Sequence, residues 1–286
     1  MMPLTDWIGR EESATDVLRS EPVRALEAAL DRDGAAYTAG TAMPPLRHWL
    51  SFWVIAPRSG LGRDGHPKLG GFLPDVGAHW GRPARRMWAG SRLEFHHDLP
   101  LDQPATRRAV IEAVSEKHGR SGGLVFVTVR QDISDAAGRL CVTDRHDIVY
   151  REDGNSQTVP EPAPASISGD QQHEQAFLAD ATLLFRYSAL TFNGHRIHYD
   201  RDYAREVEGY GGLVVHGPLL ATLLCDFARA LRPQQAMARF SFRGRRPVID
   251  GQGFTLCAKD AADGGLALWI RDHEGMLAMT AEAAFS

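Results

Sequence analysis

The chain has 286 residues, of which 43% are hydrophobic, and its formal net charge is -4. A chain of this length and composition can bury a sizeable core and fits two medium-sized domains. The charge argues against wholesale binding of nucleic acid, and no uninterrupted apolar stretch is long enough to span a bilayer. The N-terminus has no long apolar segment behind a basic end, so a secretory signal is not expected.

Three cysteines, Cys141, Cys225 and Cys257, lie in apolar runs and show no CxxC spacing. This pattern predicts buried free thiols in a reducing compartment. We therefore expect a cytoplasmic protein.

The first half of the chain contains one predicted helix and several predicted strands. Ser20 and Pro22 precede apolar residues at helical spacing, which indicates a short amphipathic helix that Gly34 ends. The apolar segment 44–57 is bracketed by prolines, and its periodicity does not decide between a buried helix and a strand. Alternating or β-rich runs predict strands at residues 92–95, 124–130 and 140–150.

Residues 59–71, SGLGRDGHPKLGG, form a glycine-rich stretch of the kind that can bind phosphate. The stretch has neither the GxxxxGK[ST] order nor a GxGxxG pattern after a strand. We therefore expect a plain loop here.

A segment rich in Pro, Ser and Gly at residues 152–170 is the clearest linker. After it we expect a strand at 182–187, a polar loop, and a helix at 215–231 that is apolar on nearly every face and therefore buried. Further β runs, joined by turns that suit antiparallel hairpins, follow at residues 240–242, 254–259, 266–270 and 276–283. One long helix wrapped by an antiparallel sheet is an α+β arrangement.

The two halves end on similar sequences. A Gly-x-Leu-x-x-Thr pattern begins at Gly138 and again at Gly275, preceded by VRQD at 129–132 and by IRD at 270–272. The similarity suggests a duplicated unit, although any amphipathic hairpin can look alike.

Polar, titratable and glycine residues gather in the stretch 185–224, between two apolar segments. Near its end, His216-Gly217-Pro218 opens the predicted buried helix. The first N–H groups of such a helix have no intrahelical partner and carry the positive end of its dipole. An acceptor that gains negative charge can therefore be stabilised there.

The string 191–200, TFNGHRIHYD, followed by Val215-His216-Gly217, resembles the MaoC-like hydratases and dehydratases of the hot-dog fold. Asn193 stands at the position of the family's Asp, and His198 stands at that of its catalytic His. Asp200 and Ala204 follow in register. There are two departures, because Asn193 replaces the Asp and His195-Arg196 replaces an Asn-Pro pair. This variant is similar to the double hot-dog CoA hydratases that include mesaconyl-C4-CoA and itaconyl-CoA hydratases and the type 2 hydroxyacyl-thioester dehydratases.

The resemblance covers nearly the whole chain and implies a tandem, or double, hot-dog in which each unit wraps an antiparallel sheet around a long central helix. Residues 64–67, 86–90 and 117–122 look like the degenerate N-terminal repeat of this family, which lacks the His motif. The expected units are an N-terminal helical extension at 1–40, a degenerate hot-dog at 41–152, a linker at 153–170 and a catalytic hot-dog at 171–286.

The resemblance also implies the roles of the catalytic residues in hydrating an α,β-unsaturated thioester. His198 is the expected base, because imidazole titrates near neutral pH. Asn193 cannot take a proton and is expected to orient water or to donate from its amide. The N–H of Gly217 is expected to bind the thioester carbonyl, and the missing side chain allows close approach. Asp200 either holds the ring of His198 or caps the following helix.

Substrate-binding candidates are less sharply defined. His195 and Arg196 would suit a substrate with a free carboxylate, or they are a hydrogen-bonded histidine and a solvated arginine. Arg243, Arg245 and Arg246 form a basic cluster that could bind the phosphates of coenzyme A, although such clusters more often form a solvated face. The full set of candidates is His195, Arg196, His216, Tyr199, Arg243 and Arg246.

Two other site chemistries fit the sequence less well. His195, His198, His216 and Asp200 could in principle supply zinc ligands, but the spacing is not HExxH and the resemblance explains these residues without a metal. A serine hydrolase fits the residues of the motif less well still. We expect no metal.

The sequence therefore predicts a hydro-lyase that reversibly hydrates a short enoyl-CoA, with itaconyl-CoA or mesaconyl-C4-CoA converted to citramalyl-CoA as the first candidates. One alternative is a 3-hydroxyacyl-thioester dehydratase of fatty-acid synthesis, which would need a long apolar tunnel. Another is a hot-dog that only binds acyl-CoA or acts as a thioesterase, which Asn193 keeps open. We expect no cofactor beyond the coenzyme A of the substrate, no nucleic-acid or membrane partner, and a homodimer.

Overall fold

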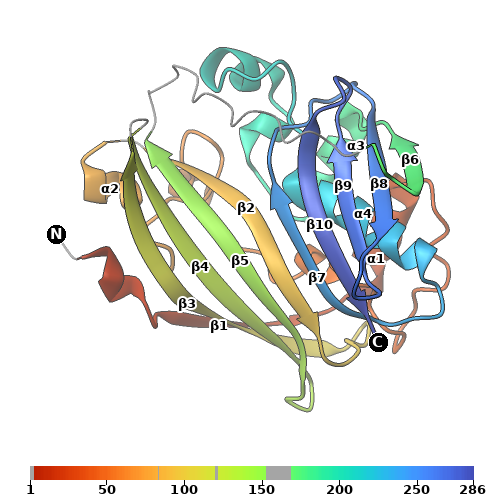
Figure 1. The fold of residues 1–286 in the computed structure, drawn as a ribbon. Helices are drawn as coiled ribbons and strands as arrows, with labels where there is room; N and C mark the ends of the chain where they lie inside the picture. The colour runs from red at the N-terminus through yellow and green to blue at the C-terminus, as the bar shows by residue number, and fades with distance from the viewer. Residues whose placement is uncertain (1–2, 83, 120–121, 153–168) are drawn as a thin grey trace.

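The computed structural model describes residues 3–82, 84–119, 122–152 and 169–286. Within them one ten-stranded sheet has the order β1-β3-β4-β5-β2-β7-β10-β9-β8-β6, and its neighbouring strands are antiparallel. The two halves of the chain lie side by side, joined where β2 pairs with β7 (Figure 1). The strands of the first half are β1 (Glu11–Val17), β2 (Ala84–Phe95), β3 (Pro104–Gly119), β4 (Gly122–Asp135) and β5 (Leu140–Glu152). Those of the second half are β6 (His173–Phe177), β7 (Met237–Gly244), β8 (Phe254–Asp260), β9 (Leu266–Arg271) and β10 (Leu277–Phe285).

The long helix α4 (Gly217–Leu231) confirms the central helix expected from the sequence. Pro218 in its first turn costs no hydrogen bond, because the first N–H groups of a helix have no intrahelical acceptor. Ten consecutive residues, Leu219 to Ala228, are buried. The helix packs on β7, β8, β9 and β10, so it forms the core of the second half.

The strand expected at 182–187 is wrong, because this segment is the helix α3 (Ala181–Leu190). The carboxylate of Asp180 accepts a hydrogen bond of 2.8 Å from the N–H of Leu183, which caps the helix. The buried residues Leu183, Leu184 and Tyr187 have helical spacing. The capping carboxylate of Asp180 favours the helix despite the β-like composition of residues 182–187.

The double hot-dog architecture is confirmed, but the expected long helix is present only in the second half. In the described part of the first half, the helices are the short α1 (Ser20–Ala29) and α2 (Val76–Trp80). The helix α1 packs against α3 of the second half and not along its own sheet. The first half also has single helical turns, at Leu4–Trp7 before β1 and at Arg47–Leu50 and Arg58–Gly60 between α1 and α2.

The N-terminal residues 1–40 and the apolar segment 44–57 differ from what the sequence indicates. Residues 1–40 are not purely a helical extension, because β1 pairs with β3 as an edge strand of the sheet. The apolar segment 44–57 is neither a three-turn helix nor a strand, and holds only the single turn Arg47–Leu50. Residues 59–71 form the loop that was predicted. The expected linker at 153–170 lies outside the described residues apart from its last two.

The repeated hairpin is a real structural repeat. The Asp135 carboxylate accepts hydrogen bonds from the N–H groups of Ala137 and Arg139 at 3.0 and 2.9 Å. Asp272 does the same with Glu274 and Met276 at 2.9 and 2.8 Å. Gly138 and Gly275 end these turns, both at φ 80°. Asp272 therefore matches Asp135, three residues later than the alignment to 129–132 suggested.

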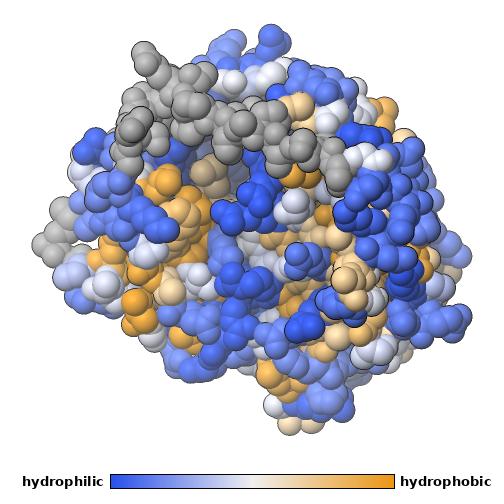
Figure 2. Space-filling view, in the orientation of Figure 1, coloured by the Kyte–Doolittle hydropathy of each residue, from blue (hydrophilic) through white to orange (hydrophobic). Residues whose placement is uncertain are grey.

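The three cysteines are buried and unpaired, as predicted. None of the helices in the described ranges is long and apolar enough to cross a membrane. Hydrophilic residues cover the middle of the sheet face that points away from α4, with hydrophobic patches on either side (Figure 2).

Candidate active site

His198 lies at the end of the single 3-10 turn η4 (Arg196–His198), with 7% of its surface exposed. Its Nδ1 is 2.7 Å from the carbonyl oxygen of Val214. Because a carbonyl can only accept, Nδ1 carries the hydrogen and Nε2 keeps its lone pair. The N–H of Val214 in turn donates to the carbonyl of Ile197 at 2.9 Å, which ties the two segments together.

The start of α4 lies beside this histidine. The ring of His216 stacks on the ring of His198, with centroids 3.7 Å apart and planes 18° from parallel. His216 is fully buried, and the hydroxyl of Ser188 lies 2.8 Å from its Nε2. The next residue, Gly217, is the first of α4, and a Cβ there would meet no atom within 4 Å. The open space leaves room for a ligand at the helix start.

Asn193 lies at the mouth of the site on the turn after α3. Its side-chain oxygen accepts a hydrogen bond of 3.0 Å from the N–H of His195. Its own N–H donates to the carbonyl of Ser188 at 2.8 Å. With the oxygen occupied, the amide NH2 of Asn193 is the part left to donate.

Burial keeps the site histidines neutral. It lowers the pKa of His198 to about 4, although the hydrogen bond to Val214 favours the charged ring. Burial, with repulsion from His66 and His198, lowers the pKa of His195 to about 2. Burial also holds the pKa of His216 well below its usual range. A neutral imidazole is the form that can accept a proton from water.

A cavity of about 500 Å³ borders this site at Asn193 and Pro218, while His198 and Gly217 are not part of its wall. Asn193, Gly194 and Pro218 contribute to its wall from the second half. The first half contributes aromatic, apolar and basic side chains, among them Trp49, Phe52, Trp53, His66, Lys68, Phe72, Arg86, Trp88, Arg107, Gln131 and His146. The site is therefore shared between the two halves.

Among the described residues of the first half no long helix covers the sheet, which leaves the sheet free to line a cavity. In the second half, Ala281 and Ala283 of β10 are buried in the core that contains α4. The matching positions of β5, counted from the shared hairpin turn, are Asp144 and His146. His146 lines the cavity, and Asp144 lies under it at 2.7 Å. Small apolar residues that face a helix are thus replaced by polar ones that face a cavity.

Asp144 anchors the floor of this cavity. It is 1% exposed and accepts hydrogen bonds from Trp49 Nε1 at 2.8 Å and from His146, with His48 at 3.3 Å. Burial alone would raise the pKa of Asp144, but the two histidines hold it well below the usual range. Trp88 stacks on His146 at 4.2 Å. The cluster makes a rigid polar floor.

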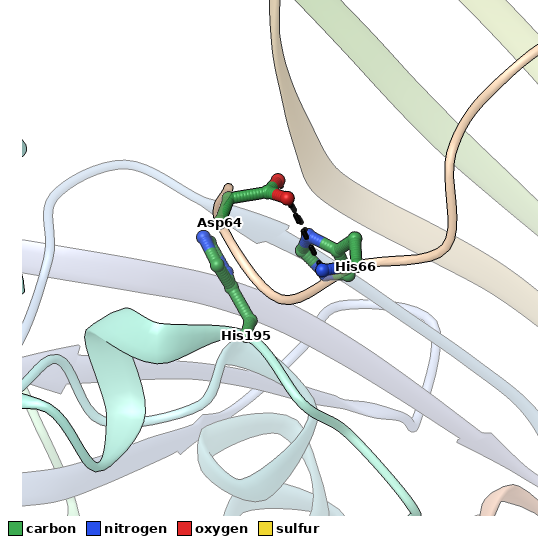
Figure 3. Close-up of side chains that lie close together, drawn as sticks. All are labelled: Asp64, His66 and His195. Carbon is green, nitrogen blue, oxygen red and sulfur yellow. Dashed lines mark hydrogen bonds and ion pairs between the residues drawn. The ribbon is translucent and has the colours of Figure 1, made fainter. Parts of the chain in front are cut away.

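Asp64 and His66 lie on the glycine-rich loop of the first half and face His195 (Figure 3). His66 Nδ1 is 3.0 Å from the Asp64 carboxylate, and the centroids of the His66 and His195 rings are 4.2 Å apart. The N–H of Arg196 donates to the Asp64 carbonyl at 2.9 Å. The loop is thus attached directly to the motif.

Comparison with known proteins agrees with this geometry. Residues 46–250 match the family model of the type 2 hydroxyacyl-thioester dehydratases. The chain is 44% identical over 278 residues to a mesaconyl-C4-CoA hydratase of Chloroflexus aurantiacus, covering 96% of this chain and 95% of that one. It is 30% identical to a mitochondrial type 2 hydroxyacyl-thioester dehydratase of Schizosaccharomyces pombe, covering 80% and 81% of the two chains.

The chain belongs to the type 2 hydroxyacyl-thioester dehydratase family. It is an acyl-CoA hydratase of the MaoC-like group. The solved MaoC-like dehydratase of Phytophthora capsici shares its fold, with a TM-score of 0.69 at 14% identity over 99% of this chain and 97% of that one. A Mycobacterium tuberculosis protein with a double hotdog fold gives a TM-score of 0.60 at 15% identity over 97% and 96%.

Two residues predicted to contact the substrate, Arg196 and Tyr199, form hydrogen bonds with other residues of the chain. Arg196 donates to the Asp200 carboxylate at 2.7 and 3.0 Å and lies 4.1 Å above the ring of Tyr203. Asp200 also accepts from the N–H of Tyr203 at 3.0 Å, so it caps the next turn and does not hold His198. The hydroxyl of Tyr199 donates to the carbonyl of Gly194 at 3.0 Å. Neither Arg196 nor Tyr199 contributes to the cavity wall.

Three further substrate-binding predictions are not supported. His216 has no exposed surface, so it cannot touch a ligand, and it supports His198 from below. Arg243 alternates with the buried Phe242 along β7 and therefore faces the side of the sheet away from α4. Arg246 lies by the carboxylates of Asp272 and Glu274 at 3.3 and 2.8 Å. The basic cluster is thus divided between places outside the cavity.

The zinc ligand set considered from the sequence does not converge. The stacked rings of His198 and His216 are nearly parallel, so their in-plane nitrogen lone pairs do not point at one another. Asp200 is occupied by Arg196. Among the described residues, three ligand-type side chains come within 4.8 Å of one another in a different group, Asp64, His66 and His195.

Sequence reasoning missed the contribution of the first half. The signal was present, because the segments 64–67 and 86–90 had been recognised as family features without a role. Strand alternation places Arg86 and Trp88 on one face of β2, and both line the cavity. The sequence alone does not show that these segments lie close to the motif around His198 in the fold.

Proposed function

We propose that the chain hydrates a short enoyl-CoA that carries a free carboxylate, converting mesaconyl-C4-CoA or itaconyl-CoA to citramalyl-CoA. The identity of 44% to a mesaconyl-C4-CoA hydratase over nearly the full length of both chains is the observation that carries this proposal. The reaction needs no cofactor beyond the coenzyme A of the substrate.

The proposed mechanism uses Asn193, which lines the cavity, together with His198 and Gly217, which lie next to that wall at η4 and at the start of α4. With mesaconyl-C4-CoA, whose double bond is conjugated with the thioester, water held by Nε2 of His198 adds to the β carbon, and one of its protons passes to the imidazole. The C=C electron pair moves onto the thioester oxygen, where the N–H of Gly217 at the start of α4 stabilises the enolate. The imidazolium then returns the proton to the α carbon. Asn193 donates from its amide to orient the reactants.

Arg86 is our candidate for reading the substrate carboxylate, in place of Arg196. It lines the cavity, where its guanidinium interacts with the hydroxyl of Tyr150 and, among the described residues, forms no ion pair with a carboxylate. Its charge is close enough to His66 and His195 to lower the pKa of each, after the larger effect of burial. The other two cations of the wall are engaged, Lys68 with the Ser59 carbonyl and Arg107 with Glu12.

Replacing Arg86 with Gln tests this assignment. A charge-assisted hydrogen bond contributes about 1.5–3 kcal/mol, so kcat/KM for mesaconyl-C4-CoA should fall roughly 10–100-fold. The value for crotonyl-CoA, which lacks the carboxylate, should change little. Arg92→Gln, in an exposed pair with Asp147, is the matched control. Equal losses on both substrates would remove Arg86 from carboxylate recognition.

The family name and the relative of Schizosaccharomyces pombe favour a second candidate, the dehydration of 3-hydroxyacyl thioesters of fatty-acid synthesis. The two are separated by following the enoyl-thioester absorbance with itaconyl-CoA, mesaconyl-C4-CoA, crotonyl-CoA and longer neutral chains. We expect fast loss with a dicarboxylate and none with His198→Ala. Preference for longer neutral chains would favour the fatty-acid reaction.

We also propose that the enzyme is a homodimer, the first expectation for a closed assembly. Light scattering should then give twice the 31.5 kDa of one chain. A mass of one chain at micromolar concentration would contradict this.

A further inference from the structure

The loop of the first half that carries Asp64 and His66 is fitted closely to the catalytic motif. Gly65 has φ 88°, and a Cβ there would collide with the carbonyl oxygen of Gly194. A Cβ on Gly194 would in turn lie 2.8 Å from the Gly65 carbonyl. Glycine on both sides therefore allows the two backbones to touch, one residue from Asn193 and one from His66.

The arrangement gives His66 the same defined hydrogen position as His198. Asp64 Oδ2 can only accept when ionised, so Nδ1 of His66 carries the hydrogen and Nε2 keeps its lone pair. A second hydrogen bond, from the N–H of His66 to Asp64 Oδ1 at 3.1 Å, fixes the pair. His66 lines the cavity together with Asn193.

The surroundings of Asp64 and His66 favour an ionised carboxylate beside a neutral imidazole. Burial alone would raise the pKa of Asp64, but its hydrogen bonds to His66 lower it to about 2. Burial and the nearby Arg86 lower the pKa of His66, while Asp64 acts in the opposite direction. His66 also disfavours the charged form of His198, so the two imidazoles interact. Asp64 is thus an ionised carboxylate that supports one neutral imidazole beside another.

We propose that Asp64 and His66 supply a carboxylate-backed hydrogen-bond acceptor for the attacking water, in the place where Asn193 can offer only its amide NH2. Nε2 of His66 accepts a hydrogen bond from the attacking water whose other hydrogen is directed at Nε2 of His198. His66 is a catalytic residue in this account because it touches the water. Asp64 is a positioning residue because it acts through His66. The inference rests on the hydratase reaction, but not on which acyl chain is used.

The step balances without another reactant. One O–H bond of water breaks and its proton moves to His198, while the oxygen forms a bond to the β carbon. His66 keeps its hydrogen bond to this oxygen, which becomes the hydroxyl group, and draws electron density towards it because Asp64 increases the proton affinity of the ring. The proton on His198 then bonds to the α carbon, and both imidazoles are neutral again.

The decisive experiment is a double-mutant cycle of His66→Gln and His198→Gln with crotonyl-CoA and mesaconyl-C4-CoA. His66 holds the reacting water but does not take its proton, so losing this hydrogen bond in His66→Gln should lower kcat about 10–100-fold with KM changed less than about threefold. If both rings hold one water, the double variant should be little slower than His198→Gln alone. Independent, multiplying effects would overturn the shared-water proposal.

His79→Gln is the matched control, since His79 lies beside Glu116 away from the cavity and should keep full activity. Asp64→Asn removes the charge but retains an acceptor, so its kcat should fall about tenfold while KM and the melting temperature stay near wild type. The activity of Asp64→Asn should be lower than that of the wild type at every pH. The pH at which activity falls on the alkaline side should be the same for both. A loss explained wholly by KM or by melting would make the loop structural only.

A metal at the same residues is the competing explanation and can be separated directly. Dialysis of the wild-type enzyme against EDTA should leave its activity unchanged. Loss of activity that Zn²⁺ restores would overturn the proposal, because the three side chains would then be ligands. An inactive wild type on every enoyl-CoA would instead contradict the proposed function, whereas an active wild type with normal His66→Gln activity would contradict only the inference.

Discussion

The histidines around η4 form a nearly continuous chain of rings, from His66 at the cavity through His195 and His198 to the buried His216. Each ring is removed from water, and each therefore pays a desolvation cost when it is protonated. Keeping them neutral preserves a base at the site near physiological pH. The same feature makes the folded state sensitive to acid.

The effect of acid follows from the pKa values. His195 and His198 have folded pKa values of about 2 and about 4, below the ordinary 6.5. Below pH 6.5 the unfolded chain takes up protons that the folded chain refuses, so the free energy of unfolding is full above pH 6.5 and falls towards pH 4. At pH 5 each such histidine should cost about 2 kcal/mol relative to pH 7.5.

Urea unfolding at pH 7.5 and pH 5 checks this prediction. His195→Gln should remove about 2 kcal/mol of the difference in the free energy of unfolding between the two pH values. His173→Gln, at an exposed position of β6, should leave that difference unchanged. Equal pH dependence in the wild type and His195→Gln would show that His195 is not held neutral.

Among single residues, His198, Asn193 and Gly217 can be picked out from the sequence because all three belong to one local motif, and their catalytic roles remain predictions. Arg196 pairs with Asp200, four residues away on the same turn, and does not line the cavity. Asp64, His66 and Arg86 could not be found as site residues, since their approach to the motif depends on how two distant segments pack.

The elements around α4 are held by a buried group of charges. Arg47 is 1% exposed and donates to Glu27 of α1 at 2.5 Å and to Asp226 of α4 at 2.9 and 3.1 Å. The single turn at Arg47–Leu50 thus connects α1 to the central helix. Buried charges are stable only when they are paired. The network therefore holds the first-half segment that contains α1 and Arg47 against α4 of the second half.

Removing the centre of this network should be costly. Arg47→Leu leaves two buried carboxylates, of which Arg32 still reaches Asp226 at 2.5 Å, and should lower the free energy of unfolding by about 3 kcal/mol. Urea denaturation measures the change. Arg92→Gln breaks an exposed pair with Asp147 and should cost less than about 1 kcal/mol. Similar costs for the two variants would contradict the structural role of Arg47.

Among the elements, α4 and the two hairpins were predictable because apolar continuity and turn residues are local signals. The composition of the segment 182–187 favours a strand, whereas the capping carboxylate of Asp180, which lies before that segment, favours the observed helix. The segment 44–57 gave no periodic signal, and its conformation depends on Arg47 finding partners in other elements.

On the scale of the whole molecule, the two halves share a sheet but differ in what covers it. In the second half the sheet packs on α4, and in the first half the matching face lines the cavity with residues such as His146. Loss of a central helix thus creates space for a substrate. The family resemblance predicted the duplication, but composition and periodicity could not show that one repeat lacked its helix.

The architecture therefore assigns complementary tasks to the halves. The second half supplies His198, Asn193 and the start of α4, and the first half supplies the cavity floor, Arg86 and the Asp64 and His66 pair. A hydratase, a thioesterase and a binding module would all use such a cavity. Water adds to the C=C bond in the first and to the thioester carbonyl in the second, and the third catalyses no reaction.

Mass spectrometry of the products formed from mesaconyl-C4-CoA in ¹⁸O-labelled water is the most direct test of the central claim. The account predicts an intact thioester with one ¹⁸O in the acyl chain, the mass of citramalyl-CoA, and no free coenzyme A. Free coenzyme A with a labelled carboxylate would indicate a thioesterase, and unchanged substrate would indicate a binding module. Either result would contradict hydration at His198.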